Sequence, residues 1–202
     1  MSTSHAATRP DTRTRLLQAA ASLMWERSFQ ATGVDDLCER AEAKKGSFYH
    51  FFPSKVDLAI AAIEGSWQQV QEAVFEPVFS SDAGGLEQLR TLSEKVYEFQ
   101  RRAAADTGAI LGCPFGNLGQ EMATQDARIR ESLARIFAGH CAYIEQALAR
   151  AEAAGEIPAG DNRLRARNIY ALMQGVQLLA KVNNDAEILR SITPALMAIA
   201  GH

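Results

Sequence analysis

The sequence has few cysteines and no long apolar run, and each shortage excludes a class of protein. Its three cysteines, Cys38, Cys113 and Cys141, are odd in number and lack CxxC spacing, which fits a reducing compartment rather than a disulfide framework. No segment approaches the roughly 20 consecutive apolar residues that cross a bilayer. The first residues, MSTSHAATRPDTRTR, lack the apolar core of a secretory signal. We therefore expect a cytoplasmic protein with no membrane partner.

Prolines and strand-like patterns are also scarce. The six prolines are widely scattered, and no long linker is evident. Sustained alternation of apolar and polar residues is missing, whereas apolar residues recur at helical spacing almost throughout. With 47% hydrophobic residues, the 202-residue chain can bury a substantial core. The sequence predicts an all-α protein that begins with a disordered polar arm over residues 1–10.

Familiar catalytic motifs are absent from the sequence. It contains no HExxH, no GxSxG and no phosphate-binding loop. His140 and Cys141 are neighbours, but adjacent residues on a helix point in different directions, and no third metal ligand is evident. The sequence therefore predicts no enzyme, no metal site and no cofactor. A helical enzyme and a helical adaptor with a vestigial DNA-binding motif remain as alternatives.

Positive charge is concentrated near the N-terminus. Residues 1–60 hold eight Lys/Arg against seven Asp/Glu, and the remainder holds thirteen against seventeen. Within residues 40–55 a single acid, Glu42, stands among four cations, Arg40, Lys44, Lys45 and Lys55. A local positive patch on an otherwise acidic protein favours a confined nucleic-acid footprint.

Residues 32–58, TGVDDLCERAEAKKGSFYHFFPSKVDL, have the pattern of two short helices and the start of a third. Thr32 and Asp35 form a capping-box-like pair at the first start, and Ser54 and Asp57 form another at the last. The middle helix, from about Lys44 to Phe51, combines cations, a glycine and aromatic donors. Such a helix can lie in the major groove of DNA.

The residues expected to contact DNA share donor groups or a small side chain. Lys45 and Ser47 can reach base edges, Tyr49 and His50 can donate to phosphates, and Gly46 permits close approach. Lys55 lies at the next helix N-terminus, where the dipole favours a phosphate. The predicted set is Thr32, Lys44, Lys45, Gly46, Ser47, Tyr49, His50 and Lys55, while Phe48, Phe51 and Phe52 are predicted to pack inward. Each of these residues alone would also fit a solvated helix end.

The segment from Thr12 to Leu58 resembles the DNA-binding domain of the tetracycline-repressor-like (TetR) family. That family's pattern is T-x-V-x-D-I/L-x-x-x-A followed by K-G-x-x-Y-x-H/Y/F-F-x-S-K-x-x-L. The matching residues are Thr32, Val34, Asp36, Leu37, Ala41, Lys45, Gly46, Tyr49, Phe51, Phe52, Ser54, Lys55 and Leu58. Two positions depart, because Glu42 replaces the usual turn glycine and Lys44 replaces the usual Ser/Thr cap. Loss of such a cap costs about 1 kcal/mol.

The resemblance implies a three-helix helix-turn-helix domain over residues 11–58 and a larger helical domain over 59–202. It implies a transcriptional regulator, most often a repressor, that binds a palindromic double-stranded DNA operator as a homodimer and is released by a small-molecule effector. The last two apolar helices, about 161–182 and 185–200, can form the dimer interface. Burial of their apolar faces within one subunit fits the pattern equally well.

An effector site needs apolar walls with a few polar groups. The residues nominated for it are Trp67, Phe99, Cys113, Phe115, Met122, Phe137, Tyr143, Tyr170 and Gln174, each of which is also compatible with simple core packing. Cys113 precedes Pro114 and an expected helix N-terminus, a location that lowers the pKa of a thiol. Since some members of this family sense electrophiles or oxidants through cysteine, a Cys113-based redox or electrophile sensor is the alternative function. A small thiol buried in a tight turn is the plainer interpretation.

Overall fold

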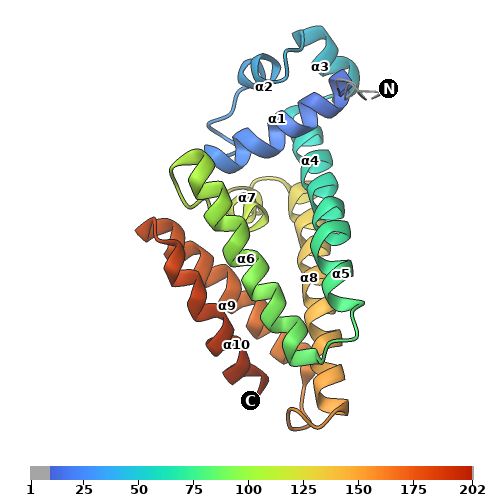
Figure 1. Ribbon diagram of the computed structural model, residues 1–202. Helices are drawn as coiled ribbons and strands as arrows, with labels where there is room; N and C mark the ends of the chain where they lie inside the picture. The colour runs from blue at the N-terminus through green and yellow to red at the C-terminus, as the bar shows by residue number, and fades with distance from the viewer. Residues whose placement is uncertain (1–9, 202) are drawn as a thin grey trace, which may run out of the picture. The chain divides into compact units, whose positions relative to one another are not determined.

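The computed structural model describes residues 10–201, and its contacts divide the chain into two compact units, residues 1–65 and 66–202. All regular elements in the described range are helical, as predicted (Figure 1). The division falls after residue 65, inside a helix, whereas the sequence predicts that the DNA-binding domain ends at residue 58. Apart from Pro10, the predicted polar arm lies outside the described residues. None of the described helices combines the length and apolar character needed to span a membrane.

Unit 1 contains α1 (Thr12–Glu26), α2 (Val34–Arg40), α3 (Lys45–Phe51) and the first part of α4 (Lys55–Val70). Two of these helices have only seven residues, too few to be stable alone in water. They are held by a shared core of fully buried side chains, Leu16, Leu37, Phe48 and Leu58. Burial of each such side chain contributes about 1.5–3 kcal/mol, so packing compensates for weak local helix formation.

Side chains fix the helix starts of unit 1, with one correction to the sequence prediction. Helix α2 begins after Gly33, whose N–H donates to Asp36 at 2.7 Å, so the capping pair is Gly33–Asp36 rather than Thr32–Asp35. The predicted Ser54–Asp57 pair is confirmed at the start of α4, where Asp57 N–H donates to Ser54 Oγ at 3.2 Å. These bonds satisfy backbone donors that a helix N-terminus leaves unpaired.

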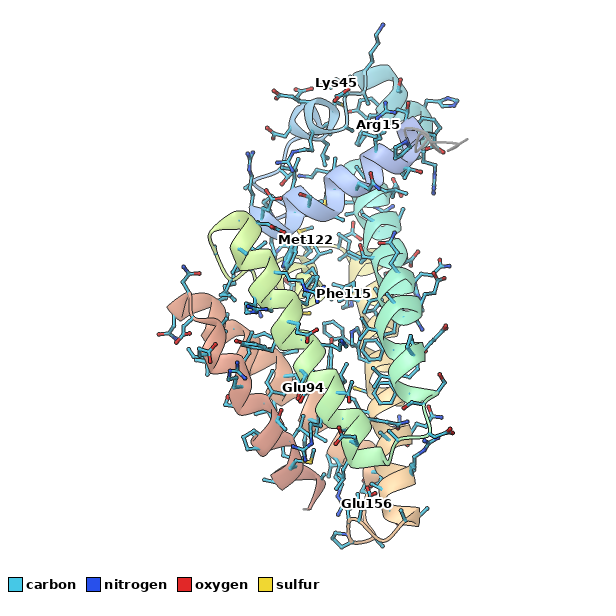
Figure 2. The ribbon with its side chains drawn as sticks, viewed as in Figure 1. Arg15, Lys45, Glu94, Phe115, Met122 and Glu156 are labelled. Atoms are coloured by element: carbon cyan, nitrogen blue, oxygen red, sulfur yellow. The ribbon has the colours of Figure 1, made fainter. Side chains whose placement is uncertain are left out.

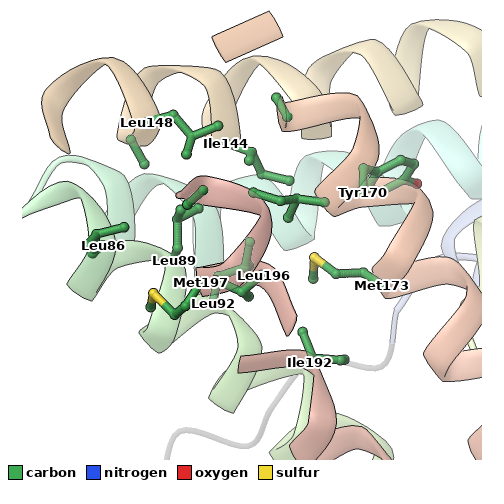
Figure 3. Packing of buried hydrophobic residues seen from close by; sticks show 14 of the residues in the cluster. Leu86, Leu89, Leu92, Ile144, Leu148, Tyr170, Met173, Ile192, Leu196 and Met197 are labelled. Atoms are coloured by element: carbon green, nitrogen blue, oxygen red, sulfur yellow. The ribbon is translucent and has the colours of Figure 1, made fainter. Parts of the chain in front are cut away.

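Unit 2 contains the rest of α4 and the remaining helical elements. These are η1 (Gln71–Phe75), α5 (Glu76–Phe79), α6 (Gly85–Thr107), α7 (Pro114–Met122), α8 (Ala127–Ala153), α9 (Asn162–Asn183), η2 (Ala186–Ser191) and α10 (Ile192–Ala200). Helices α6, α8, α9 and α10 pack on one another around a core that includes Leu89, Ile144 and Leu196 (Figure 3). Residues 185–200, predicted as one helix, form a 3₁₀ segment followed by α10.

The segment η1 is a turn of π-helix between α4 and α5. Pro77 follows it and has no backbone N–H, so the ordinary bond back to Ala73 is impossible. The preceding N–H, of Glu76, instead donates to Gln71 five residues earlier. This widening is a common response to an interrupted hydrogen-bond ladder. It brings Phe75 and Phe79 into the unit 2 core, where both are buried.

Candidate DNA-binding surface and effector site

Helix α3 separates its packing residues from its donor groups. Phe48 is fully buried in unit 1, whereas Lys44, Lys45, Tyr49 and His50 are exposed. Gly46 is exposed as well, and a Cβ placed on it would meet nothing within 4 Å, so the protein's own packing does not demand glycine there. An outside partner can therefore approach the backbone closely at Gly46. The exposed face of α3 is suited to phosphates and base edges.

The turn between α2 and α3 contains both departures from the family pattern. Glu42 has φ +47°, the left-handed conformation that favours glycine. Around it, Ala43 N–H donates to Cys38 O at 2.9 Å, as in a Schellman ending, and Arg15 Nε donates to Ala41 O at 2.8 Å. Lys44 is the N-cap of α3 and its side chain makes no capping bond. The helix-turn-helix thus forms without the usual turn glycine and hydroxyl cap.

Lys45 is paired with an acid on the neighbouring helix. Its Nζ lies 2.9 Å from Asp35 Oδ1, and the hydrogen bond and charge of Asp35 raise the pKa of Lys45 (Figure 2 labels Lys45). The two side chains are 56% and 83% exposed, so the ion pair contributes little to stability. Lys45 is consequently held at the surface by a contact that a phosphate or base can replace.

Three residues of the predicted motif lie differently from the simplest expectation. Thr32 is fully buried and its hydroxyl donates to Ser28 O at 2.7 Å, so its side chain is directed into unit 1. Lys55 Nζ donates to Phe29 O and Thr32 O, each at 3.0 Å, and lies 4.1 Å from the centroid of the Phe29 ring. Both residues therefore fasten the loop after α1, and their DNA contacts stay predictions.

The third residue is Phe51, for which the packing prediction is wrong. Its side chain is 38% exposed, and its ring meets the edge of His50 with centroids 4.9 Å apart. Phe48 and Phe52 are buried, as predicted. Phe51 is the last residue of α3, and the chain becomes extended at Phe52, so no further helical turn packs over the Phe51 ring.

In unit 2, rings from six helical elements form a cluster around His140. We call this group the ring cluster: Trp67, Phe75, Phe79, Phe115, Phe137, His140, Tyr143 and Tyr170. Trp67 stacks on His140 with centroids 4.1 Å apart and planes inclined by 28°. Phe75, Phe115 and Tyr170 surround the same imidazole at 5.1, 5.7 and 5.0 Å. Five nominated effector residues thus meet in one cluster, whereas the sequence missed His140, Phe75 and Phe79.

Gly139 makes room for the stacked pair. A Cβ on Gly139 would lie 2.9 Å from Cζ2 of Trp67, so a larger residue would push the indole away from His140. On the other side of the imidazole, Nδ1 lies 2.8 Å from Ile136 O, and because a carbonyl only accepts, Nδ1 carries the hydrogen. Burial lowers the pKa of His140 to about 4. At neutral pH the ring is uncharged and its Nε2 is a hydrogen-bond acceptor.

Tyr170 contributes the other polar group of the cluster. Its side chain is 7% exposed, and within residues 10–201 its buried hydroxyl has no hydrogen-bond partner. Burial raises the pKa of Tyr170, and the neighbouring thiols of Cys113 and Cys141 raise it further. The hydroxyl is therefore a neutral donor whose hydrogen bond is unmade, which costs about 1–3 kcal/mol in a buried site.

Cys113 differs from the sequence prediction in its acidity. It is the N-cap of α7, and Gly116 N–H donates to its Sγ at 3.4 Å. Burial nevertheless raises the pKa of the thiol, and this effect exceeds the opposing hydrogen bonds from Gly116, Gln174 and Phe115. The expectation of a lowered pKa is wrong, because a thiolate at this helix start would have to be desolvated.

The other nominated residues divide between interior and surface. Gln174 reaches the α7 start, where a Cβ on Gly116 would fall 2.2 Å from Gln174 Oε1. Met122 is buried near the end of α7, as is Phe115 near its start (Figure 2). Phe99 is 48% exposed on α6, so its nomination as a wall of a buried site is not supported.

Sequence reasoning also missed Gln100, which holds the loop before α7. Gln100 is fully buried, its Nε2 donates to Gly112 O at 2.9 Å, and its Oε1 accepts from Gly112 N–H at 3.1 Å. Asn117 Nδ2 adds a bond to Leu111 O at 2.8 Å. The sequence signal for its burial was a glutamine four residues after Val96, on the apolar stripe of α6.

Within the described part of the chain, no group of three or more His, Cys, Asp or Glu is arranged to hold a metal ion.

Comparisons with known proteins agree with this architecture. The family model "Bacterial regulatory proteins, tetR family" matches residues 16–62, and "Tetracyclin repressor-like, C-terminal domain" matches residues 85–196. The chain is 28% identical to the transcriptional regulator AcuR of Cereibacter sphaeroides over 88% of this chain and 80% of AcuR. It is 27% identical to the HTH-type transcriptional repressor NemR of Escherichia coli over 91% of each chain.

Solved structures give the same result. A regulatory protein TetR from Rhodobacter sphaeroides superposes with TM-score 0.81 at 27% identity, over 92% of this chain and 96% of that one. The reduced form of E. coli NemR superposes with TM-score 0.79 at 26% identity, over 93% and 95%. The resemblance inferred from residues 12–58 is confirmed and extends along most of the chain. This protein belongs to the TetR family of helix-turn-helix, DNA-binding transcriptional regulators.

Proposed function

We propose that this protein is a ligand-responsive repressor that binds a palindromic operator as a homodimer and is released by a small-molecule effector. The observation that carries the proposal is the division on α3, where Phe48 is buried and Lys45, Tyr49 and His50 are exposed. Lys45 and Ser47 contact base edges, whereas Lys44, Tyr49 and His50 contact phosphates. A good base contact discriminates by about 1–3 kcal/mol.

A second copy of the chain supplies the second recognition helix. Helix α9 supports this step, because it exposes an apolar stripe of Leu164, Leu178, Leu179 and Val182, with exposed fractions of 50, 43, 55 and 74%. Ala171 and Gly175 are exposed between them, and a Cβ on Gly175 would meet nothing within 4 Å. A self-complementary stripe of this kind suits a two-fold interface, which matches the symmetry of a palindrome.

The predicted share of α10 in this interface is smaller. Its main apolar side chains, Ile192 and Leu196, are buried in the core of their own subunit. We therefore assign most of the interface to α9. The remaining contacts come from small exposed residues of α10, Pro194 and Ala198.

The effector binds in unit 2, at the ring cluster with Cys113 and Gln174. Release of DNA requires the effector to prefer the state whose recognition helices are wrongly spaced, because tight binding to both states shifts nothing. Half-sites are separated by about 34–36 Å, so small changes in helix separation weaken binding.

A thiol sensor centred on Cys113 is the second candidate function. The bonds that Gly116 and Gln174 make to its sulfur favour it, and the similar E. coli NemR structure is of a reduced form. Against it, burial raises the pKa of Cys113, which keeps the thiol protonated at neutral pH. We therefore favour reversible binding of an effector.

The test begins with selection of bound fragments from a random DNA pool, which is expected to enrich a palindrome. Lys45→Ala is then expected to weaken operator binding by about 10–100-fold and to relax the sequence preference at the base that Lys45 contacts. Lys95→Ala on α6 is the matched control, since Lys95 is also an exposed, ion-paired lysine, 48% exposed. Enrichment of no symmetric sequence, or equal binding by the Lys45 variant and the wild type, would refute the proposal. Screening small molecules for release of the selected operator then tests the effector step.

A further inference from the structure

We propose that the effector is an uncharged aromatic molecule whose carbonyl or hydroxyl oxygen accepts a hydrogen bond from Tyr170 Oη. This inference rests on the proposed function, because it names the chemical class of that effector. It rests on three properties of the ring cluster: an unpaired hydroxyl, rings that keep partial solvent accessibility, and polar members that are uncharged.

The unpaired hydroxyl fixes one polar contact. Tyr170 Oη is buried without a partner in the described part of the chain, although its ring is held by Phe137 at 5.2 Å and His140 at 5.0 Å. Buried polar groups are almost always hydrogen-bonded, and an orphan needs an explanation. With the ring fixed, a group brought into the cluster can accept the bond. A ligand oxygen at that place recovers the stability that the orphan loses.

The cluster is not sealed from solvent. The side chain of His140 keeps partial solvent accessibility, and Trp67, Phe137 and Tyr143 are partly accessible in the same way. The lone pair on His140 Nε2 adds an acceptor beside these rings, because Nδ1 donates to Ile136 O.

The rings of the cluster favour an aromatic ligand. Ring pairs in the cluster already use stacked and edge-to-face geometry, such as Trp67 on His140 at 4.1 Å and Phe115 against Trp67 at 6.3 Å. An additional ring gains about 0.5–1.5 kcal/mol per such pair beyond its burial.

The polar members of the cluster favour an uncharged ligand. Burial lowers the pKa of His140 and raises that of Tyr170, so both side chains are neutral at pH 7. Arg167 and Glu145 act on Cys141, and Arg167 is exposed while Glu145 is partly exposed. A carboxylate or ammonium entering the cluster would lose its hydration without gaining a counter-ion.

The experiment uses five probes built on one benzene ring. Acetophenone and benzyl alcohol carry a neutral oxygen, ethylbenzene has none, benzoate is an anion and benzylammonium is a cation. Binding to the full-length, DNA-free protein is followed by fluorescence of Trp67 in a Trp25→Phe background, with calorimetric titration of the wild type as a second measurement. We expect both neutral oxygen compounds to bind at least about tenfold more tightly than the other three, a gain matching one buried hydrogen bond.

Tyr170→Phe is expected to abolish the preference for acetophenone over ethylbenzene while leaving ethylbenzene binding unchanged. Phe99→Leu, an aromatic change at an exposed site, is expected to keep the preference. Tighter binding of benzoate or benzylammonium, or a preference that survives in the Tyr170 variant, would overturn the inference.

Operator release by the same probes is measured separately. Selective binding of the neutral oxygen compounds without release of the operator would contradict the proposed regulation but agree with the proposed ligand class. Release of the operator by all five probes alike would agree with the proposed regulation but contradict the proposed ligand class.

Discussion

Helix α3 in unit 1 and the ring cluster in unit 2 present two kinds of binding chemistry within one chain. Helix α3 exposes a charge and polar donors, such as Lys45 and Tyr49, above a small buried core. The ring cluster gathers uncharged rings around His140 and Tyr170 in the interior. The first arrangement suits a polyanion that keeps its water, and the second suits a small molecule that loses it. Changes in unit 1 should therefore depend on salt, and changes in unit 2 should depend on burial.

The largest effect is expected from the apolar stripe of unit 2. The double substitution Leu179→Glu with Val182→Glu places two carboxylates where α9 is proposed to meet its copy, and buried unpaired charges are strongly unfavourable. Light scattering should give a mass near 22.0 kDa instead of twice that value. Operator affinity should fall by at least about 100-fold, because one half-site contact is lost.

Phe99→Glu is the control for this change, because Phe99 is 48% exposed on another helix of the same unit. It should remain dimeric. A dimer that tolerates both glutamates would place the interface elsewhere.

The second largest effect is the loss of stability that acidic pH should cause through the imidazole of His140. An unfolded histidine binds a proton below pH 6.5, whereas folded His140 does so only near pH 4, so protons favour unfolding. The stability that neutral His140 preserves is present above pH 6.5 and is lost as the pH falls to about 4. The full loss is about 3 kcal/mol.

Denaturant unfolding at pH 7 and pH 5 measures this contribution. His140→Phe should show a smaller decrease between the two pH values than the wild type. Phe137→Leu alters a non-titrating ring of the cluster and should lower stability equally at both. An identical pH dependence in wild type and His140 variant would show that the imidazole is not buried as described.

The prediction for His140 concerns a feature that the sequence showed poorly. The ring cluster joins residues from α4, η1, α5, α7, α8 and α9, and no local periodicity indicates such a meeting. His140 was weighed only as a metal ligand, and its role as the centre of the rings was missed. On α6 the sequence placed Phe99 inside, but the buried position belongs to Gln100, because the helix rotates the next residue inward. For Cys113 the hydrogen-bond donors were visible in sequence and the burial that outweighs them was not.

The candidate DNA-binding surface was far more predictable, because its signals are local. Short helix spacing, the cap at the start of α4 and a cluster of cations mark the segment around α3, and the structure exposes Lys44, Lys45, Tyr49 and His50 together. The exceptions are residues whose surroundings come from elsewhere in unit 1. Thr32 is buried by the end of α1, and Phe51 is exposed because α3 ends at that residue. Helix existence followed from sequence, whereas side-chain direction at helix ends required the tertiary structure.

A third, smaller effect is expected at the Lys45–Asp35 ion pair. Asp35→Asn removes an anion beside the proposed DNA surface and frees Lys45 from its partner at 2.9 Å. Operator affinity should rise by about fivefold at low salt, corresponding to about 1 kcal/mol, and the gain should shrink as salt is added. Glu39→Gln removes an exposed acid from the same helix without touching Lys45 and should give a smaller gain. Equal gains would mean that the pair itself is irrelevant to binding.

The smallest effect is expected at Glu42, in the turn before α3. Its φ of +47° costs a residue with a side chain about 1–2 kcal/mol, whereas glycine loses about 0.4–1 kcal/mol through the freedom of its unfolded chain. Glu42→Gly should therefore stabilise unit 1 by a net of about 0.5–1 kcal/mol. Unfolding followed by Trp25 fluorescence in a Trp67→Phe background measures this change.

Glu39→Gly, within helix α2, is the contrast for this experiment and should destabilise unit 1 by about 1 kcal/mol. Operator affinity of the Glu42 variant should stay near that of the wild type, because the altered term is backbone strain and not a DNA contact. A destabilised Glu42→Gly protein would mean that the glutamate's own contacts outweigh its strain. In that case Glu42 would stabilise this turn more than glycine does, and the positive φ alone would not explain the residue found at position 42.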